Sequence, residues 1–258
     1  FTFNRVVIIE SLEDDEFRSG EELHAYLTAA DLGSVPIQYQ RCSSVQEFRA
    51  ILRQLADAAT NGSTPILHVE THGRDDGQGL VFRDGTFLSW SEFSDALIDL
   101  NLATGFNLLV VVAACFGAHF LLSEFSLRSI SPFWGLIGPT DSTHGPELLG
   151  SFRTFYRTLL TGSPANSVFA TLQKTRLDAG ELLVQPAEEL FLHGILRYVK
   201  KLCSPAALRF RANRNRKRLK KVGRVVSLGH ASRALRSAHG SDSFDLFANA
   251  YFMLDEFP

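Results

Sequence analysis

Hydrophobic and polar residues alternate along the first two-thirds of the chain in blocks of two kinds. Short apolar runs bounded by turn residues indicate buried strands, whereas apolar residues that recur every three or four positions indicate helices. The expected strands are Arg5–Glu10, Pro36–Gln40, Pro65–Thr71, Asn107–Ala114 and Phe133–Gly138. The expected helices span residues 21–30, 45–59, 92–101, 119–125, 147–160 and 164–175.

Local signals mark where several of these elements begin and end. The pair Asp84-Gly85 lies between the short runs 80–82 and 86–88, and it predicts a hairpin turn. A serine just before a helical pattern is a favourable N-cap, because its hydroxyl can accept a bond from a free backbone amide. The expected caps are Ser19, Ser44 and either Ser89 or Ser91.

Alternation of strands with helices predicts an α/β fold with a mostly parallel sheet and helices on both faces. The run Asn107–Ala114 is apolar at nearly every position, as expected for a strand at the centre of such a sheet. Ligands of open α/β sheets bind outside the carboxyl ends of the strands. Residues that directly follow the strands are therefore the first candidates for function.

The last quarter of the chain has a different character. Residues 1–194 carry a net charge of -12 and residues 195–258 carry +10, and Arg209–Arg224 holds nine Lys and Arg in sixteen residues with no acid. We therefore expect a domain over residues 1–186 and a basic, helical C-terminal extension over residues 187–258. The basic segment suits a solvated helix or linker, a dock for an acidic surface such as Glu10–Glu16, or a nucleic-acid site with salt-sensitive affinity.

Composition narrows the cellular setting. The chain has no apolar run long enough to span a membrane, and no basic-plus-apolar leader opens it. Its three cysteines are too few and too widely spaced for a disulfide framework or a zinc site, and they suit a reducing cytoplasm. We expect a cytoplasmic protein without a metal or other cofactor. Because the chain opens at Phe1 and not at Met, we also expect further domains outside it.

Two short motifs directly follow expected strands. His72-Gly73 comes after the third strand and Cys115 after the fourth. If these strands are neighbours, an imidazole and a thiol project from one edge of the sheet. A free thiol with a pKa near ~8.5 is mostly protonated at neutral pH. A nearby imidazole can take that proton to create a stronger nucleophile, and it can later protonate a leaving amine.

Glycines beside these two residues have a physical role. Gly73 has no side chain, so the backbone can turn sharply after His72 and offer its N–H to a substrate carbonyl. The N–H of Cys115 is a second candidate donor, and two such donors would stabilise a tetrahedral oxyanion. Gly117 leaves room for a substrate backbone beside the thiol. The expected catalytic pair is thus His72 and Cys115, with Gly73 and Cys115 as oxyanion donors.

Residues 65–117 resemble the core of the caspase-like (clan CD) cysteine peptidases, most closely the bacterial CHAT family. The matching stretches are ILHVETHG (Ile66–Gly73), LSWSE (Leu88–Glu92) and LLVVVAACFG (Leu108–Gly117), and a wider resemblance covers about residues 5–180. The resemblance implies a caspase–haemoglobinase fold and no metal. It also implies hydrolysis of protein or peptide substrates by a dyad of His72 and Cys115.

The resemblance further implies a regulated bacterial effector protease that a sensor domain or partner protein activates in stress or phage defence. Phe116 replaces the Arg, Gln or Gly that follows the nucleophile in true caspases, so specificity for aspartate is not implied. The alternative is a catalytically silent scaffold of the same fold that binds partners. The presence of both His72 and Cys115 favours the enzyme.

Acidic residues near the strand ends could bind a basic substrate side chain, since a buried charge needs a paired charge. Asp141, just after the fifth strand, is the first candidate, and Asp75 and Asp76 come second. The alternative for Asp141 is a turn or helix cap with Ser142 and Thr143.

Other chemically active side chains have competing interpretations. His119 is a rival base to His72. His68 and Glu70 share a strand face with His72 by the period of two; His68 suits a hydrogen-bonded core residue, and Glu70 could orient His72 or pair with a helix. The remaining candidates are Trp90, as a cleft wall or a core anchor, and Cys42 and Cys203, as structural or surface thiols.

Overall fold

The computed structural model describes residues 1–30, 32–121, 130–221, 223, 225–229, 231 and 241–254, with the side chains of 241–243 excepted. These residues fall into two compact units. The first is drawn from residues 1–187, and the second mainly from residues 188–254.

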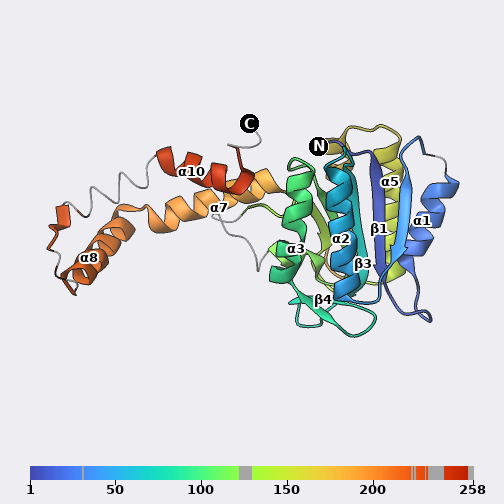
Figure 1. Ribbon diagram of the computed structural model, residues 1–258, viewed down its shortest axis with the longest axis horizontal. Helices are drawn as coiled ribbons and strands as arrows, with labels where there is room; N and C mark the ends of the chain where they lie inside the picture. Colours follow the sequence, from blue (N-terminus) through green and yellow to red (C-terminus); the bar gives the residue numbers. More distant parts are fainter. Residues whose placement is uncertain are drawn as a thin grey trace. The chain divides into compact units, whose positions relative to one another are not determined.

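A mostly parallel sheet forms the centre of the first unit (Figure 1). Its main strands lie in the order β2-β1-β3-β6-β7-β8, with β8 antiparallel to β7 and the others parallel. The hairpin of β4 and β5 extends from the end of β3. The strands are β1 (Arg5–Ser11), β2 (Ile37–Arg41), β3 (Pro65–Gly73), β4 (Gly79–Val81), β5 (Phe87–Ser89), β6 (Leu109–Ala113), β7 (Gly135–Pro139) and β8 (Leu182–Pro186).

Helices cover both faces of this sheet, as the sequence predicts. Helices α2 and α3 pack against each other on one face, and α1 and α5 pack together on the other (Figure 1). The helices of this unit are α1 (Ser19–Ala29), α2 (Val45–Ala59), α3 (Trp90–Ala103), α5 (Gly145–Leu160) and α6 (Ala165–Leu172), with the short 3₁₀ helix η1 (Gly117–His119).

The expected helix starts are confirmed at two serines and wrong at a third. Ser44 accepts a hydrogen bond from the amide of Glu47, and Ser89 forms a full capping box with Glu92. Helix α1 instead begins at Ser19 itself, whose hydroxyl donates to Glu70 on β3 at 2.7 Å. Ser19 therefore joins a helix to the sheet and does not cap the helix.

Strand β8 is absent from the expectations and is the main error in the topology. It is short, it ends at Pro186, and only its pairing with β7 identifies it as a strand. The helix expected over residues 119–125 falls mostly outside the described residues. The part that the structure describes there is the 3₁₀ turn η1.

Two apolar layers hold the sheet between its helices. On the α1 and α5 face, Val6, Ile66 and Leu109 lie in a row across three strands, and together with Ile137 of β7 they pack with buried residues of α5 such as Phe152. On the other face the aromatic residues gather around α3. They are Phe48, Phe82, Trp90, Phe93, Phe120 and Phe133, each at most 2% exposed.

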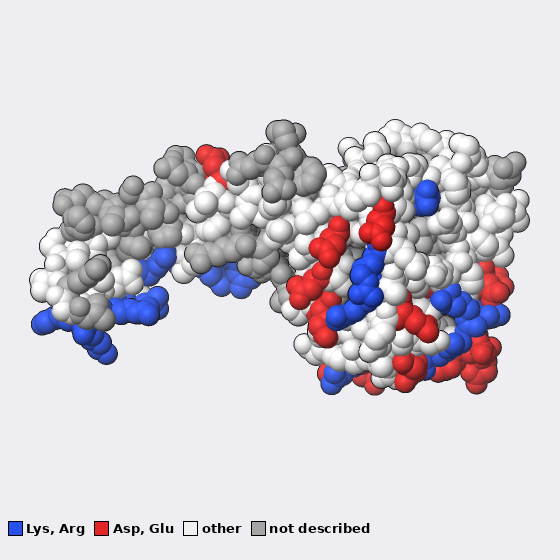
Figure 2. All heavy atoms as spheres, viewed as in Figure 1, with Lys and Arg blue, Asp and Glu red and all other residues white. Residues whose placement is uncertain are grey.

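The second unit is helical, as predicted, with α7 (Ala187–Leu202), α8 (Pro205–Lys221) and α10 (Ser241–Phe252). Phe191 of α7 packs against Phe244, Tyr251 and Phe252 of α10. Lysine and arginine side chains project from α8 into solvent (Figure 2). None of the helices within the described ranges combines the length and the hydrophobicity that a membrane span requires.

Candidate functional site

The strands that precede His72 and Cys115 are direct neighbours in the sheet. In the parallel ladder of β3 and β6, Glu70 is paired with Ala113, an offset of 113 - 70 = 43 residues. The same offset, 115 - 72 = 43, relates His72 to Cys115 just beyond the last paired residues. Adjacent strands lie about 4.8 Å apart. The two residues therefore leave the sheet at the same height on neighbouring strands.

The backbones at this point are in direct contact. A Cβ atom placed on Gly73 would lie 1.8 Å from the carbonyl oxygen of Cys115. Real non-bonded contacts of this kind are far longer, so only glycine permits this approach. The absence of a side chain at Gly73 permits this close approach of the two strand ends, which the pairing of β3 with β6 brings together.

Both side chains lie on the face of the sheet that α1 and α5 cover. His72 continues the row of Ile66, His68 and Glu70, and side chains alternate between faces along a strand. His68 contacts Tyr156 of α5, and Glu70 contacts Ser19 of α1. The sulfur of Cys115 lies beside Thr143, two residues before α5. The imidazole and the thiol thus share one face as well as one height.

The Cys115 thiol is partly exposed and lies against the loop between β7 and α5. Its sulfur is 3.5 Å from Ser142 Oγ and 3.5 Å from both the amide nitrogen and the carbonyl oxygen of Thr143. The next residue, Phe116, has φ 60° in the left-handed region, and its amide donates to the carbonyl of Asp141 at 3.1 Å. A bulky residue held in this region is uncommon and costly. The sharp bend turns the chain away from the sheet directly after the sulfur.

The imidazole of His72 is half exposed and hydrogen-bonded to a residue of the loop after β1. Its Nε2 lies 3.0 Å from Glu16 Oε2, and the same oxygen accepts the amide N–H of Glu13 at 2.9 Å. Partial burial acts to raise the pKa of Glu16, but the hydrogen bonds from Glu13 and His72 outweigh it, so the pKa lies below its usual value. Glu16 is thus an ionised neighbour of the imidazole at neutral pH.

Sequence reasoning did not single out Glu16. The sequence places it only in an acidic run, with no spacing that relates it to His72. Glu70, the residue considered for orienting His72, has another role: its carboxylate binds His68 Nε2 at 2.8 Å and the Ser19 hydroxyl at 2.7 Å. His68 is fully buried with both ring nitrogens bound, which confirms the interpretation as a core histidine.

Gly73 occupies a special position in the ladder of β3 and β4. It is paired with Leu80, and the amide of Arg74 donates to the carbonyl of Gly79. In the alternating pattern of an antiparallel ladder, this bond makes Gly73 and Leu80 a non-hydrogen-bonded pair. The amide N–H of Gly73 therefore points away from β4.

The acidic candidates for a substrate pocket differ in their surroundings. Asp141 is exposed, and its backbone carbonyl accepts a hydrogen bond from the amide of Phe116, the residue after Cys115. Its carboxylate accepts a hydrogen bond from the amide of Ser142 at 2.8 Å. That contact matches the turn interpretation. Asp76 pairs with Arg74 at 3.0 Å and accepts the Gln78 amide.

The other candidate side chains have contacts of their own. His119 packs over Gly77 of the β3–β4 turn and against the ring of Phe116. Trp90 is 2% exposed and donates to the carbonyl of Gly77, so it is a core anchor and not a cleft wall. Cys42 is buried, which raises the pKa of its thiol to about 12. All three cysteines are free, and Cys203 lies in the second unit.

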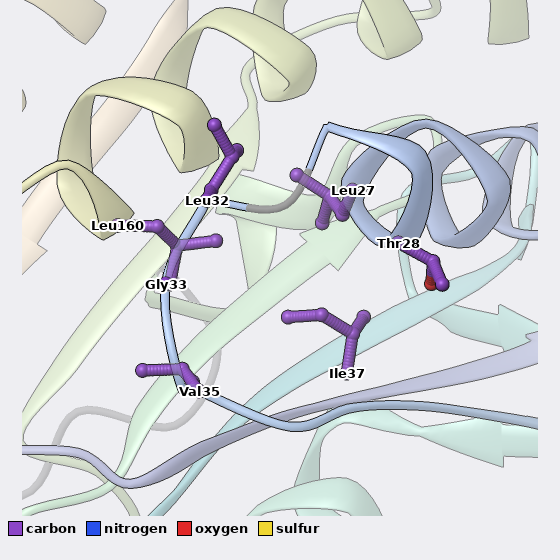
Figure 3. A pocket seen from close by; sticks show the side chains of 7 residues that line it. All are labelled: Leu27, Thr28, Leu32, Gly33, Val35, Ile37 and Leu160. Carbon is purple, nitrogen blue, oxygen red and sulfur yellow. The ribbon is translucent and has the colours of Figure 1, made fainter.

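Two hollows on the first unit lie away from this site. One, of about 170 Å³, is lined mainly by apolar side chains at the ends of α1 and α5 and the start of β2 (Figure 3). It is at the opposite end of the sheet from the carboxyl ends of the strands. The other lies between α2 and α3, where side chains of both charges meet (Figure 2). There Arg49 pairs with Glu92 at 3.3 Å. Within the described ranges, no three His, Cys, Asp or Glu side chains are grouped as metal ligands.

The fold has a counterpart among solved structures. The crystal structure of the Drosophila initiator caspase Dronc is similar to this chain with a TM-score of 0.52 and 13% identity, over 71% of this chain and 80% of that chain. The chain has a caspase-like α/β fold. No protein-family model and no curated protein matches its sequence. At 13% identity the similarity concerns the caspase-like architecture alone.

Proposed function

We propose that this protein is a cysteine endopeptidase in which His72 is the general base and Cys115 the nucleophile. The observation that carries the proposal is the shared height and shared face of these two residues on adjacent strands of a caspase-like sheet. An imidazole and a partly exposed thiol in this arrangement are the groups that covalent acyl transfer requires.

The proposed reaction follows from those two groups. His72 takes the thiol proton of Cys115, and the sulfur attacks the substrate carbonyl carbon to form a C–S bond. The amide N–H groups of Gly73 and Cys115 are the proposed donors to the oxyanion, each worth about 3 kcal/mol in comparable sites. The C–N bond then breaks as His72 protonates the leaving amine. Water, deprotonated by His72, hydrolyses the thioester and restores the thiol.

We further propose that Asp141 selects substrates with Lys or Arg before the scissile bond. Asp141 is exposed, and its backbone carbonyl accepts a hydrogen bond from Phe116, the residue after the nucleophile. Asp76 is the weaker candidate, because Arg74 already pairs with its carboxylate. A desolvated cationic side chain needs such a partner charge.

We extend the proposal to the cellular role of the protein. The stretches Ile66–Gly73 and Leu108–Gly117 resemble those of bacterial CHAT peptidases. They support a regulated effector protease, activated by a sensor domain or a partner protein in stress or phage defence. The free thiols suit the reducing cytoplasm. The basic helix α8 is the proposed contact for an acidic partner surface.

A peptide-library assay tests the proposal. Cleavage should fall on the order of a thousandfold in Cys115→Ala and in His72→Ala. The control Cys203→Ala removes a different thiol and should cleave like the wild type. Equal cleavage by Cys115→Ala and the wild type would falsify the assignment. A folded wild type that cleaves no peptide and whose Cys115 reacts no faster than Cys203 would identify a silent scaffold.

A further inference from the structure

We propose that Glu16 is a positioning residue for His72 and that it makes Nδ1 the basic nitrogen of the ring. The inference rests on the proposed function of His72 and Cys115. It starts from the contact between His72 Nε2 and Glu16 Oε2 at 3.0 Å. An ionised carboxylate can only accept a hydrogen bond. Nε2 must therefore carry the proton, and in the neutral ring the free electron pair is on Nδ1.

The carboxylate of Glu16 is held in place by its own loop. The oxygen that binds His72 also accepts the amide N–H of Glu13 at 2.9 Å, which closes a turn of the loop on itself. Asp14, between them, pairs with Arg41 at 2.6 Å and Arg83 at 3.4 Å. These contacts tie the loop to β2 and to the β4–β5 hairpin, so Glu16 has a defined position although it is exposed.

Both ends of the loop are anchored in the buried interior. It leaves β1 at Ser11, which is 2% exposed, and it enters α1 at Ser19, which is also 2% exposed. At the far end the Gly20 amide donates to Glu10 Oε1 at 2.7 Å, and Ser19 donates to Glu70. The amino end of a helix favours such carboxylates.

Close packing makes this anchor rigid. A Cβ on Gly20 would lie 2.9 Å from Glu10 Oε1 and 3.0 Å from Glu70 Cγ, so the start of α1 is pressed against the sheet. Glu70 lies on β3 two residues before His72. His72 and Glu16 are thus both fixed relative to the end of β3. His72 belongs to the strand, and Glu16 lies just before α1, whose first residues pack on Glu70.

The other charged side chains near His72 pair elsewhere, and Glu16 pairs with the imidazole. Arg74, two residues beyond His72, pairs with Asp76. The sulfur of Cys115 lies against Ser142 and Thr143, which bear no charge. Among the described contacts of His72, the ionic partner is Glu16.

The experiment compares Glu16→Ala, Glu16→Gln and the matched control Asp15→Ala, which removes an exposed acid from the same loop. Glu16→Ala should lower kcat about tenfold with little change in KM, because the misplaced ring affects proton transfer and not binding. Glu16→Gln keeps an oxygen acceptor and should recover part of the loss.

A second measurement needs no substrate. In ¹⁵N-labelled protein, with His72 assigned by comparison with His72→Ala, the neutral ring should carry its proton on Nε2. In Glu16→Ala the nitrogen shifts should move toward a mixture of the two tautomers. Asp15→Ala should match the wild type.

Different results would contradict the role of Glu16 and the peptidase activity of Cys115. Full activity in Cys115→Ala would remove the peptidase proposal, and the inference with it. If Cys115→Ala is inactive while Glu16→Ala keeps the kcat and the ring tautomer of Asp15→Ala, the peptidase stands and the role of Glu16 is wrong. A wild-type ring protonated on Nδ1 would also overturn it.

Discussion

Gly73 and Cys115 meet backbone to backbone at the carboxyl end of the sheet. A Cβ on Gly73 would lie 1.8 Å from the Cys115 carbonyl oxygen, 2.6 Å from its carbonyl carbon and 3.0 Å from its Cα. All three atoms belong to the main chain, so no side-chain rotation can relieve the overlap. The spacing of β3 and β6 at the candidate site therefore depends on this glycine.

Gly73→Ala should disrupt the site more than it disrupts the fold. The added methyl group must push the two strand ends apart, which should cost about 1–3 kcal/mol of stability. A displacement near 1 Å between the reacting groups should reduce kcat/KM about a hundredfold. Gly150→Ala is the control, because a Cβ there meets nothing within 4 Å in the middle of α5. Wild-type cleavage by Gly73→Ala would contradict the steric argument.

The thiols should react with iodoacetamide in an order set by burial. Cys42 is 3% exposed, and burial raises the pKa of its thiol to about 12. Cys115 is partly exposed next to His72. At neutral pH, Cys115 should be alkylated at least ~100-fold faster than Cys42, since only the thiolate is a nucleophile. Peptide mass spectrometry over time measures both rates, and faster labelling of Cys42 would refute the burial argument.

Asp141→Ala should change specificity and not catalysis. If its carboxylate pairs with a basic substrate side chain, kcat/KM for peptides with Lys or Arg should fall about tenfold relative to peptides with a neutral residue there. Asp57→Ala removes an exposed acid from α2 and should leave that ratio unchanged. An unchanged ratio in Asp141→Ala would leave Asp141 with its role in the turn, through the Ser142 amide.

Glu10 should make the stability of the first unit depend on pH. Burial raises its pKa above the usual 4.5, although Tyr39 and the Gly20 amide donate hydrogen bonds to it. The folded chain thus holds this proton more tightly than the unfolded chain does. Its contribution to stability is complete below pH 4.5 and is lost as the pH rises through the raised value.

Replacing Glu10 with Gln removes that titration. The free energy of unfolding of the wild type should decline, relative to Glu10→Gln, from pH 4.5 towards neutrality. Urea titrations across this range measure the difference. Glu189→Gln, at an exposed position of α7, is the control and should run parallel to the wild type. A constant difference between the wild type and Glu10→Gln would contradict the prediction.

Several elements of the fold follow from local chemistry and could be predicted from the residues alone. Short runs bounded by turn residues predicted the strands β1, β2, β3, β6 and β7, and the wholly apolar run of β6 predicted a strand buried on both faces. The serine caps of α2 and α3 follow from hydrogen bonds within a single turn. His72 and Cys115 could be chosen because each directly follows such a strand. Their height in the sheet follows once these strands are known to be neighbours.

Contacts between segments far apart in the chain could be identified only from the folded structure. The pairing of Glu16 with His72 spans 56 residues, and that of Ser19 with Glu70 spans 51. Neither leaves a periodic pattern, because each depends on where a loop or a helix end comes to rest on the sheet. Strand β8 was missed for the same reason, since its pairing with β7 and not its composition makes it a strand. Local propensity acts over a few residues, and long-range packing determines the rest.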